Sequence, residues 1–451
     1  MSTQAVIAVN RFGLGARLNE LQQAEKDPQS FLIAQLNPPT FNEKLPNSDQ
    51  LLLHMADFIQ QRRYSNFSSD CVLPNKQKKS VKKQKPFFQK SYQQLCCDTL
   101  IRAIHSPDSL SWRLLDFFSN HFSVTALGQK MVALAPTLER EAIAPHMLDK
   151  FEDMVLAVMH HPTMLVYLNN DRSFGPNSKI GKRSKKGLNE NLAREMMELH
   201  TLGVNSGYTQ ADVIELAKGI TGWSVALPLK DYKVGFYYRD NGHEPGKRIL
   251  LGKEYSQQGE AQGTAMITDL ARHPATAKHL CFKLAKHFIS DTPPQSLQDK
   301  MFKRWQETNG NIKQVMIAMI NADESWHPQS VKFKTPREYI ISAHRALNLT
   351  PKNHQSLIWS LNLLGQSPFK ANSPEGYGDI EENWNGPSAL MSRIDWSAQL
   401  VKRRQRTNPK VLSQQLFADT LSDNTQTLIQ HAESRQNALT LLLMSPEFLR
   451  R

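Results

Sequence analysis

The stretch from Leu188 to Trp223 constrains the fold most, because its pattern is that of two helices joined by a tight connection. Asn189 is a suitable N-cap for the first helix, which we expect to run to about Leu202. Gly203 then stands where the left-handed residue that ends a helix is wanted. The sequence therefore predicts a central helix pair over residues 188–223.

The second helix of this pair has a start signal and one apolar face. Thr209 and Asp212 stand three residues apart, which is the spacing of a capping box. Four apolar residues then recur at helical spacing: Val213, Leu216, Ala217 and Ile220. This pattern predicts that one face of the helix is buried against the core.

The first helix is less ordinary, because polar residues adjoin its apolar face. At about 100° per residue, the apolar face consists of Leu192, Met196 and Leu199. The polar stripe beside it consists of Asn191, Glu195 and Glu198, with Arg194 on the other flank of that stripe. Two carboxylates and an amide thus border the core, where a helix with only structural needs would usually keep Glu farther away.

The net charge of +13 is concentrated in two short segments. Between Cys71 and Cys97 the basic residues are Lys76, Lys78, Lys79, Lys82, Lys83, Lys85 and Lys90, and no acid is present. Between Ser173 and Gly187 they are Lys179, Lys182, Arg183, Lys185 and Lys186, again without an acid. We expect a mobile, lysine-rich loop over residues 64–90 and a basic loop over residues 173–187. Solvation of loops explains this charge most simply, and an anionic partner is the alternative.

The apolar runs are too short for an export signal or a membrane span. The first run has five residues, Ala5–Val9, and no other run approaches the roughly 18 residues that cross a bilayer. The cysteines, Cys71, Cys96, Cys97 and Cys281, have neither the spacing of a metal site nor the density of a disulfide scaffold. The sequence therefore predicts a cytoplasmic protein, and export together with a partner stays open.

Most of the remaining chain has helical periodicity. One aromatic segment ends in Asn120 and His121, and a conspicuous loop, SPEGYGD, occupies residues 373–379. Residues 224–253 differ, because FYYR and RILLG flank the turn residues DNG, which predicts one short β-ribbon near residues 234–252. We expect a mostly α, multi-helix, two-layer globular fold in a single unit of residues 1–451.

The sequence lacks the motifs of the commonest chemistries. It contains no P-loop, no GxGxxG after a strand, no GxSxG, no HExxH and no paired CxxC. His200 is two residues from Glu198 and five from Glu195, so the Glu-x-x-His pattern of di-iron bundles is absent as well.

Several longer motifs carry a resemblance that runs from end to end. They are NRFGLGAR at 10–17, SNHFSV at 119–124, REAIAPHMLDKFEDMVLAV at 140–158, GPNS at 175–178, GLNENLAREMMELHTLGV at 187–204, GYTQADVIELAKGITGW at 207–223, HEPGK at 243–247, ARHPATAKHL at 271–280, FKTPREY at 333–339 and SPEF at 445–448. In these motifs the chain resembles the bacterial family called domain of unknown function 1800. Two residues depart from the usual family pattern: Asn169 stands where Asp is usual, and Phe118 where Trp is usual.

The resemblance implies little about activity, since that of the family is unknown. The genes of its members often lie next to genes of a second uncharacterised family, domain of unknown function 1501. Proteins of that second family resemble sulfatases and phosphatases and carry export signals. The resemblance therefore implies a sulfatase-like partner. If the Asp usual at position 169 is an essential acid or ligand, this chain lacks it.

Glu195 and Glu198 are the strongest candidates for a functional site. Their carboxylates lie one helical turn apart, and like charges that close raise the pKa of one carboxyl unless a cation intervenes. That cation could be Arg194, a residue of the basic loop or a divalent metal. A buried ion-pair network, acid–base catalysis or metal binding, and an interaction surface therefore stay open. Loss of a bound metal in Glu198→Gln would select the metal.

The hypothesis that uses most of these residues is an enzyme-like cleft for a polar or anionic ligand, such as a phosphate ester, a sulfate ester or a saccharide. Its catalytic residues would be Glu195, Glu198 and His121. Its ligand-binding residues would be Asn189, Asn191, Arg194, His243, Lys247 and Trp223. One alternative is a non-catalytic binding or maturation partner of the sulfatase-like neighbour. The other is a weak nucleic-acid binder that uses the lysine loops.

Overall fold

The computed structural model describes residues 3–67, 75–184, 187–228, 233–329, 332–351, 353–404 and 406–451. Helices dominate these residues, and the strands within them form two antiparallel pairs. The predicted mostly α, multi-helix class is confirmed. In the described part of the chain, no helix has the length and apolar content needed to cross a membrane.

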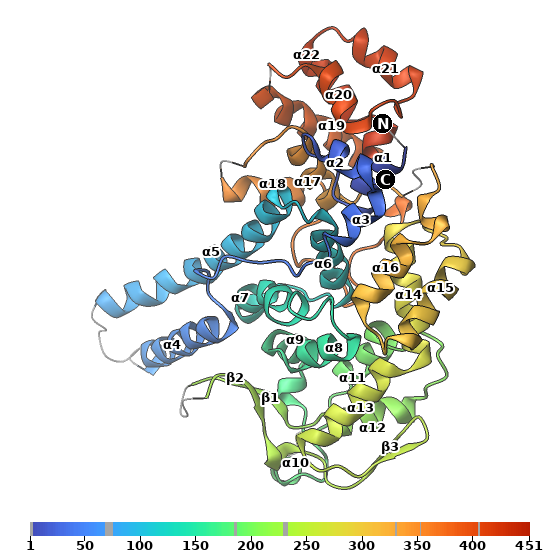
Figure 1. Cartoon of the computed structure of the whole chain (residues 1–451). Coiled ribbons are helices and arrows are strands. Elements are labelled where there is room, and N and C mark those ends of the chain that lie inside the picture. Colours follow the sequence, from blue (N-terminus) through green and yellow to red (C-terminus); the bar gives the residue numbers. More distant parts are fainter. Residues whose placement is uncertain are drawn as a thin grey trace.

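The two ends of the chain lie close together (Figure 1). The N-terminal group consists of α1 (Thr3–Ile7), the π-helical turn η1 (Ala8–Phe12), α2 (Glu20–Lys26) and α3 (Pro28–Ile33). The C-terminal group consists of α17 (Pro336–Ala346), α18 (His354–Leu363), η7 (Glu381–Asn383), α19 (Pro387–Val401), η8 (Lys402–Arg404), α20 (Pro409–Phe417), α21 (Asp423–Gln430), α22 (Arg435–Leu443) and α23 (Pro446–Leu449). Arg345 joins the groups, because its guanidinium lies 2.8 Å from the carboxylate of Glu20.

Most of the other helices form the middle, one flank and the far end of the molecule (Figure 1). The middle of the molecule contains α6 (Ser109–His121), α7 (Gly128–Leu138), η2 (Glu139–Ile143), α8 (Phe151–His160) and α9 (Pro162–Tyr167). One flank contains α13 (Glu260–Arg272), α14 (Pro274–Phe288), α15 (Gln295–Glu307), α16 (Ile312–Ile320) and η6 (Asp323–Trp326). The end opposite the termini contains η3 (Asn170–Arg172), α10 (Lys179–Ser184), α11 (Asn191–Glu195), η4 (Met196–His200) and α12 (Gln210–Gly219).

The two basic segments are more helical than predicted. α4 (Ser48–Phe67) and α5 (Asn75–His105) form a hairpin that projects from the body (Figure 1), so helix replaces much of the loop predicted for residues 64–90. Residues 68–74 lie outside the described part. The run from 76 to 85 contains no Gly or Pro, and its Lys and Gln residues are good helix formers. The basic loop predicted for residues 173–187 likewise contains α10, where Ser178 Oγ accepts from the backbone N–H of Gly181.

The central helix pair is present, with one change at its start. α12 begins at the predicted capping box of Thr209 and Asp212, and its apolar stripe is fully buried. The first helix begins at Asn191 with Glu190 as its N-cap, so the prediction of Asn189 as the N-cap is off by one residue. Asn189 still acts at this end, because its side-chain oxygen accepts from the backbone N–H of Asn191 at 2.9 Å.

The predicted β-ribbon has a different pairing. β2 (Gly235–Tyr238) pairs with β1 (Trp223–Ala226), whereas β3 (Arg248–Leu250) pairs with β4 (Lys253–Tyr255). The expected pairing of FYYR with RILLG is therefore wrong. Residues 240–242 form the 3₁₀ turn η5 and no hairpin turn. The tight turn is instead made by Leu251 and Gly252, which both have positive φ, as a two-residue hairpin requires.

Among the described residues, three π-helical turns each bury a charged or histidine side chain. These side chains are Arg11 in η1, Glu139 in η2 and His200 in η4, and each is at most 2% exposed. A π turn inserts one residue into a helix and rotates the residues after it, and such turns are frequent at functional sites. In η4 the rotation leaves Leu199 half-buried and brings His200 into the core instead.

Hydrophobic packing is continuous through the molecule. One core cluster contains residues from Ala5 to Leu449. A smaller cluster attaches the α4–α5 hairpin to α7 through residues that include Leu52, Phe58, Phe88 and Leu134. Helices α6, α14 and α17, which surround a polar cavity, all contribute to the larger cluster.

Glu338 of α17 is the centre of a buried charge network. Its carboxylate lies 2.8 Å from the guanidinium of Arg451 and 3.3 Å from that of Arg113. It also accepts from the backbone N–H of Thr335 at 2.9 Å. Both arginines donate to the backbone carbonyl of His287, at 3.0 and 2.7 Å. The network therefore ties α6, α14 and α17 together.

We expect Glu338→Gln to lower the free energy of unfolding by about 3–5 kcal/mol, since it leaves two buried guanidinium groups uncompensated. Burial opposes ionisation of Glu338, but Arg451 and Arg113 outweigh it and lower its pKa from 4.5 to about 2. The stabilisation is therefore present above pH 4.5 and is lost as the pH falls toward 2. Urea unfolding at pH 7 and at pH 3 measures both effects.

The matched control is Glu381→Gln. Glu381 pairs with Arg450, but both side chains are about a quarter to a third exposed. A partly solvated pair contributes only about 0–1 kcal/mol. Equal destabilisation by the two substitutions would contradict a special role for Glu338.

Candidate functional site

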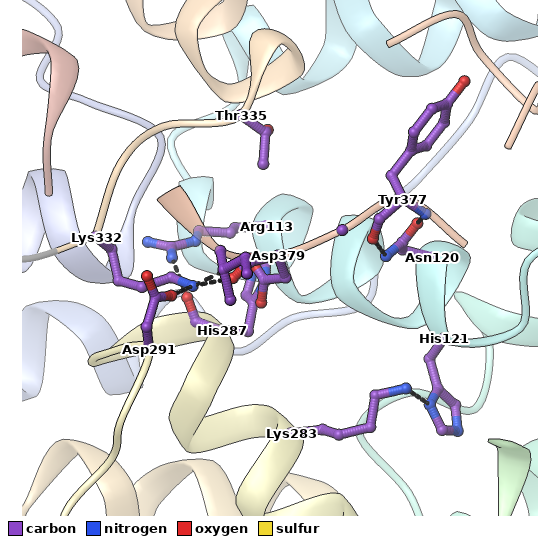
Figure 2. Close-up of polar contacts among 12 residues, drawn as sticks. Arg113, Asn120, His121, Lys283, His287, Asp291, Lys332, Thr335, Tyr377 and Asp379 are labelled. Carbon is purple, nitrogen blue, oxygen red and sulfur yellow. Dashed lines mark hydrogen bonds and ion pairs between the residues drawn. The ribbon is translucent and has the colours of Figure 1, made fainter. Parts of the chain in front are cut away.

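A polar cavity of about 550 Å³, here called the polar chamber, lies between α6, α14, the start of α17 and the loop at residues 366–383. Its titratable lining residues are Asp116, His121, Glu139, Lys283, Lys286, His287, Arg337, Glu375, Tyr377 and Asp379. Figure 2 shows several of them with the contacts that hold them. The volume lies within the range of about 300–1,000 Å³ that is usual for small-molecule sites.

The SPEGYGD loop is fixed to the end of α6 by a double hydrogen bond (Figure 2). The side-chain amide of Asn120 donates to the backbone carbonyl of Tyr377 at 2.9 Å and accepts from its backbone N–H at 2.8 Å. Gly376 has φ +90°, and a Cβ there would lie 2.6 Å from the Asn120 side-chain oxygen. The close approach therefore requires glycine at this position.

Asp379, at the end of this loop, is held by His287 and Lys332 (Figure 2). Its carboxylate lies 3.2 Å from His287 Nδ1 and 3.3 Å from Lys332 Nζ. Lys332 also contacts Asp291 at 2.5 Å. Burial opposes ionisation, but His287 and Lys332 outweigh it and hold the pKa of Asp379 far below its usual value. Asp379 is thus a neutralised carboxylate in the wall of the polar chamber.

Two further carboxylates of the chamber, the half-buried Asp116 and the buried Glu139, also have partners within the protein. Asp116 forms a 2.9 Å ion pair with Arg337. Glu139 accepts hydrogen bonds from Thr99 at 2.6 Å and from Ser119 at 3.1 Å. These contacts leave the carboxylates of Asp116 and Glu139 with partners inside the protein.

Lys283 differs from these residues, because its ammonium has no carboxylate within ion-pair distance among the described residues. Its Nζ lies 3.0 Å from Nδ1 of His121 (Figure 2). His121 Nε2 lies 3.2 Å from the backbone carbonyl of His200, to which it can only donate. Nδ1 of His121 is therefore the unprotonated nitrogen that accepts from Lys283.

Burial sets the protonation of this pair. It lowers the pKa of Lys283 to about 8, with Asp379 and Glu375 acting in the other direction. Burial and the charge of Lys283 hold the pKa of His121 well below its usual range. His121 is consequently neutral near pH 7, whereas Lys283 exchanges its proton near pH 8.

The central helix pair supports His121 through backbone groups. The carbonyls of Leu199 and His200, in the turn η4, accept from His279 Nε2 at 3.3 Å and His121 Nε2 at 3.2 Å. Carbonyls at a helix end lack partners within the helix. His279 and His121 supply those partners here, and His121 also accepts the hydrogen bond from Lys283.

Among the catalytic residues predicted from the sequence, only His121 lies in the polar chamber. Glu195 and Glu198 do not line it, and neither carboxylate has a hydrogen bond or ion pair with any other described residue. Burial and the nearby charge of Glu198 raise the pKa of Glu195, as the stripe of like charges predicts. A catalytic or metal-binding role of the two glutamates stays a prediction. In the part of the chain that the structure describes, no group of three or more His, Cys, Asp or Glu residues is arranged to hold a metal ion.

The predicted ligand-binding residues occupy several places outside the chamber. Arg194 contacts Glu190 and Gln210 at 2.9 Å each. Lys247 pairs with Glu254 at 2.8 Å on the surface. His243 Nδ1 lies 3.0 Å from the carbonyl of Thr221, at the end of the central pair.

The other three predicted ligand-binding residues have structural surroundings. Trp223 is fully buried and packs against His160, with the tilted rings 4.3 Å apart between centroids. Asn189 caps the backbone of Asn191, and Asn191 itself is exposed. None of the three lines the polar chamber.

The sequence prediction missed the basic residues of α14. His279, Lys283 and His287 stand four residues apart, so they lie on one face of this helix. That spacing is visible in the sequence and is the signal that could have identified them. Asp379 lies in the loop that the sequence marked as conspicuous, but its contacts with His287 and Lys332 join segments far apart in the chain.

Comparison with known families identifies the family of this chain. The model of the family described as "Protein of unknown function (DUF1800)" matches residues 7–450, which is almost the whole chain, so the chain belongs to this family. The predicted resemblance is confirmed. No curated protein and no solved structure matches the chain.

We expect Lys283→Met to change the pH dependence of stability. The lowered pKa means that the folded state binds fewer protons than the unfolded state between about pH 8 and pH 10.5. Burial of the charged amine therefore costs most below pH 8, and this cost falls as the pH rises through that window. Relative to the wild type, the variant should gain about 1 kcal/mol at pH 7, and this difference should fall by about 3 kcal/mol up to pH 10.5, where the variant becomes the less stable protein. Urea unfolding at four pH values measures it, and a constant difference would contradict the lowered pKa.

Proposed function

We propose that this member of the DUF1800 family is an enzyme-like protein that binds a small anionic ligand in the polar chamber and exchanges a proton with it through Lys283. One observation carries the proposal. The ammonium of Lys283 faces a cavity of about 550 Å³, and its hydrogen bond is to a neutral histidine. The positive charge of Lys283 therefore has no carboxylate as an ion-pair partner among the described residues.

Two amines in the wall of the chamber favour an anion, while its carboxylates have other partners or, like Glu375, are exposed. Its carboxylates at positions 116 and 379 are matched by Arg337 and by His287 with Lys332. Lys286 lines the chamber as well and adds a second amine. Glu375, which is exposed, offsets part of this charge. A phosphate, sulfate or carboxylate group can accept from both amines at once, and charge-assisted hydrogen bonds of this kind are stronger than neutral ones.

The protonation of Lys283 supports acid–base chemistry. With a pKa of about 8, most molecules carry the proton at pH 7 and roughly one in ten does not. The residue can therefore donate a proton to a leaving group and recover it from solvent without a large change in free energy. His121 orients the amine from one side, so the ligand has to approach the remaining N–H groups from the chamber.

Inorganic phosphate is a suitable probe, because binding of an anion raises the pKa of Lys283. At pH 8 we expect phosphate binding with a Kd of about 1 mM or tighter and an uptake of up to about half a proton per chain. Isothermal titration calorimetry in buffers with different ionisation enthalpies measures both quantities. Lys283→Met should weaken binding about tenfold or more and remove the uptake.

The matched control is Lys278→Met on the same helix. Lys278 is exposed and does not line the chamber, so its loss should leave both quantities unchanged. Absence of phosphate binding, or equal binding and proton uptake in wild type and Lys283→Met, would contradict the proposal.

A further inference from the structure

A second cavity, of about 810 Å³ and here called the apolar cavity, lies between α4, α7 and α9. Its lining residues are Met55, Phe58, Ile59, Arg62, Arg63, Thr125, Leu127, Gly128, Gln129, Lys130, Met131, Val166, Tyr167 and Asn372. Neither the proposed function nor any sequence motif accounts for this cavity. It is separate from the polar chamber, because the two have no lining residue in common.

Most of the inner surface of the apolar cavity is hydrocarbon. Met55 and Phe58 belong to the small core that attaches the α4–α5 hairpin, and Ile59 and Val166 pack against that core while staying partly exposed. Leu127, at the mouth, is 77% exposed and is the most exposed large apolar residue of the described part. Apolar surface of this kind on a folded chain marks a binding site more often than chance.

The polar atoms of the inner wall already have partners. Thr125 donates its hydroxyl proton to the carbonyl of Ala371 at 2.7 Å, so the 3.1 Å contact with Tyr167 is donated by the tyrosine. Both hydroxyl protons are thereby used inside the wall. Glu195 lies near enough to Tyr167 to raise the pKa of its phenol, in addition to the larger effect of burial. The Tyr167 end of the cavity thus disfavours an anion.

The rim of the apolar cavity is positively charged. Arg62, Arg63 and Lys130 are among the lining residues, and no Asp or Glu is among the described ones. An occupant that matches both regions has a hydrocarbon part for the inner surface and an anionic group for the rim. A single-chain carboxylate has this chemistry, and its head group can reach arginine or lysine while its chain is removed from water.

We propose that the apolar cavity binds a long-chain fatty acid anion, with the hydrocarbon chain on Phe58, Ile59 and Val166 and the carboxylate near Arg63 and Lys130. The site is independent of phosphate binding in the polar chamber. The two cavities have separate lining residues and meet at one wall, in which Thr125 of the apolar cavity donates to the carbonyl of Ala371 of the polar chamber at 2.7 Å. Loss of one activity therefore need not remove the other.

The test uses the fluorescence of cis-parinaric acid and its displacement by saturated acids. For the full chain we expect micromolar binding of the probe, at about 1–10 μM. Octanoate, decanoate and dodecanoate should displace it with rising affinity, since each buried methylene adds up to about fourfold. An affinity that does not depend on chain length would overturn the proposal.

Two substitutions locate the site. Leu127→Asp places a negative charge at the mouth and should weaken probe binding about tenfold or more. Leu127 is the N-cap of α7, where Asp is favoured, so the substitution does not endanger the fold. Lys130→Gln should weaken binding of the probe acid severalfold and leave binding of its uncharged methyl ester unchanged.

Met391→Asp is the matched control, because Met391 is 57% exposed on α19 and does not line the cavity. It should leave probe binding as in the wild type. If Leu127→Asp binds the probe as the wild type does, or if Met391→Asp weakens it equally, the acid binds elsewhere and the proposal fails. Binding of the methyl ester but not the acid would place an uncharged lipid in the cavity and would also overturn it.

Discussion

One buried carboxylate, that of Glu338, holds together parts of the chain that are far apart in sequence. It neutralises Arg113 of α6 and Arg451, and both guanidinium groups then bind the same backbone carbonyl, that of His287. α14 is thereby fixed against α6 and α17. Since Lys283 lies one turn before His287 on α14, the same contacts determine where its amine stands.

The charge of the polar chamber depends on this arrangement. The carboxylates of Asp116, Glu139 and Asp379 have cations or hydroxyl groups as partners, whereas Lys283 faces the cavity with a neutral histidine as its partner. Burial of an amine without a counter-charge costs stability, and sites that carry out chemistry are where such costs are commonly found. The two proposed sites lie on either side of the wall in which Thr125 meets Ala371.

The sequence was sufficient for the class of fold and for local signals. The helical periodicity, the capping box at Thr209 and the left-handed Gly203 all depend on neighbouring residues, and the structure contains each of them. Composition predicted less well, because the lysine-rich segment that it predicts to be a loop is largely helical in α5. Strand pairing failed as well, since the choice of β1 over β3 as partner of β2 is made by tertiary contacts.

The site was harder to predict than the fold. His121 was found because it ends an aromatic helix in a distinctive motif, but its partner Lys283 is 162 residues away. The π turns at Glu139 and His200 were not foreseeable, because they change which face of the helix is buried. A comparison of spacing along α14 would have found His279, Lys283 and His287, whereas the contacts of Asp379 required the structure.

The central claim is that Lys283 has a lowered pKa and faces an anion site. Pyridoxal 5′-phosphate tests both parts, because its aldehyde forms an imine only with an unprotonated amine and its phosphate supplies the anion. Borohydride reduction at a series of pH values, followed by peptide mass spectrometry, measures labelling of each lysine. We expect half-maximal labelling of Lys283 near pH 8, about two units below ordinary lysines, and protection by inorganic phosphate. Labelling of Lys283 only above pH 10, or labelling that phosphate does not reduce, would contradict the account.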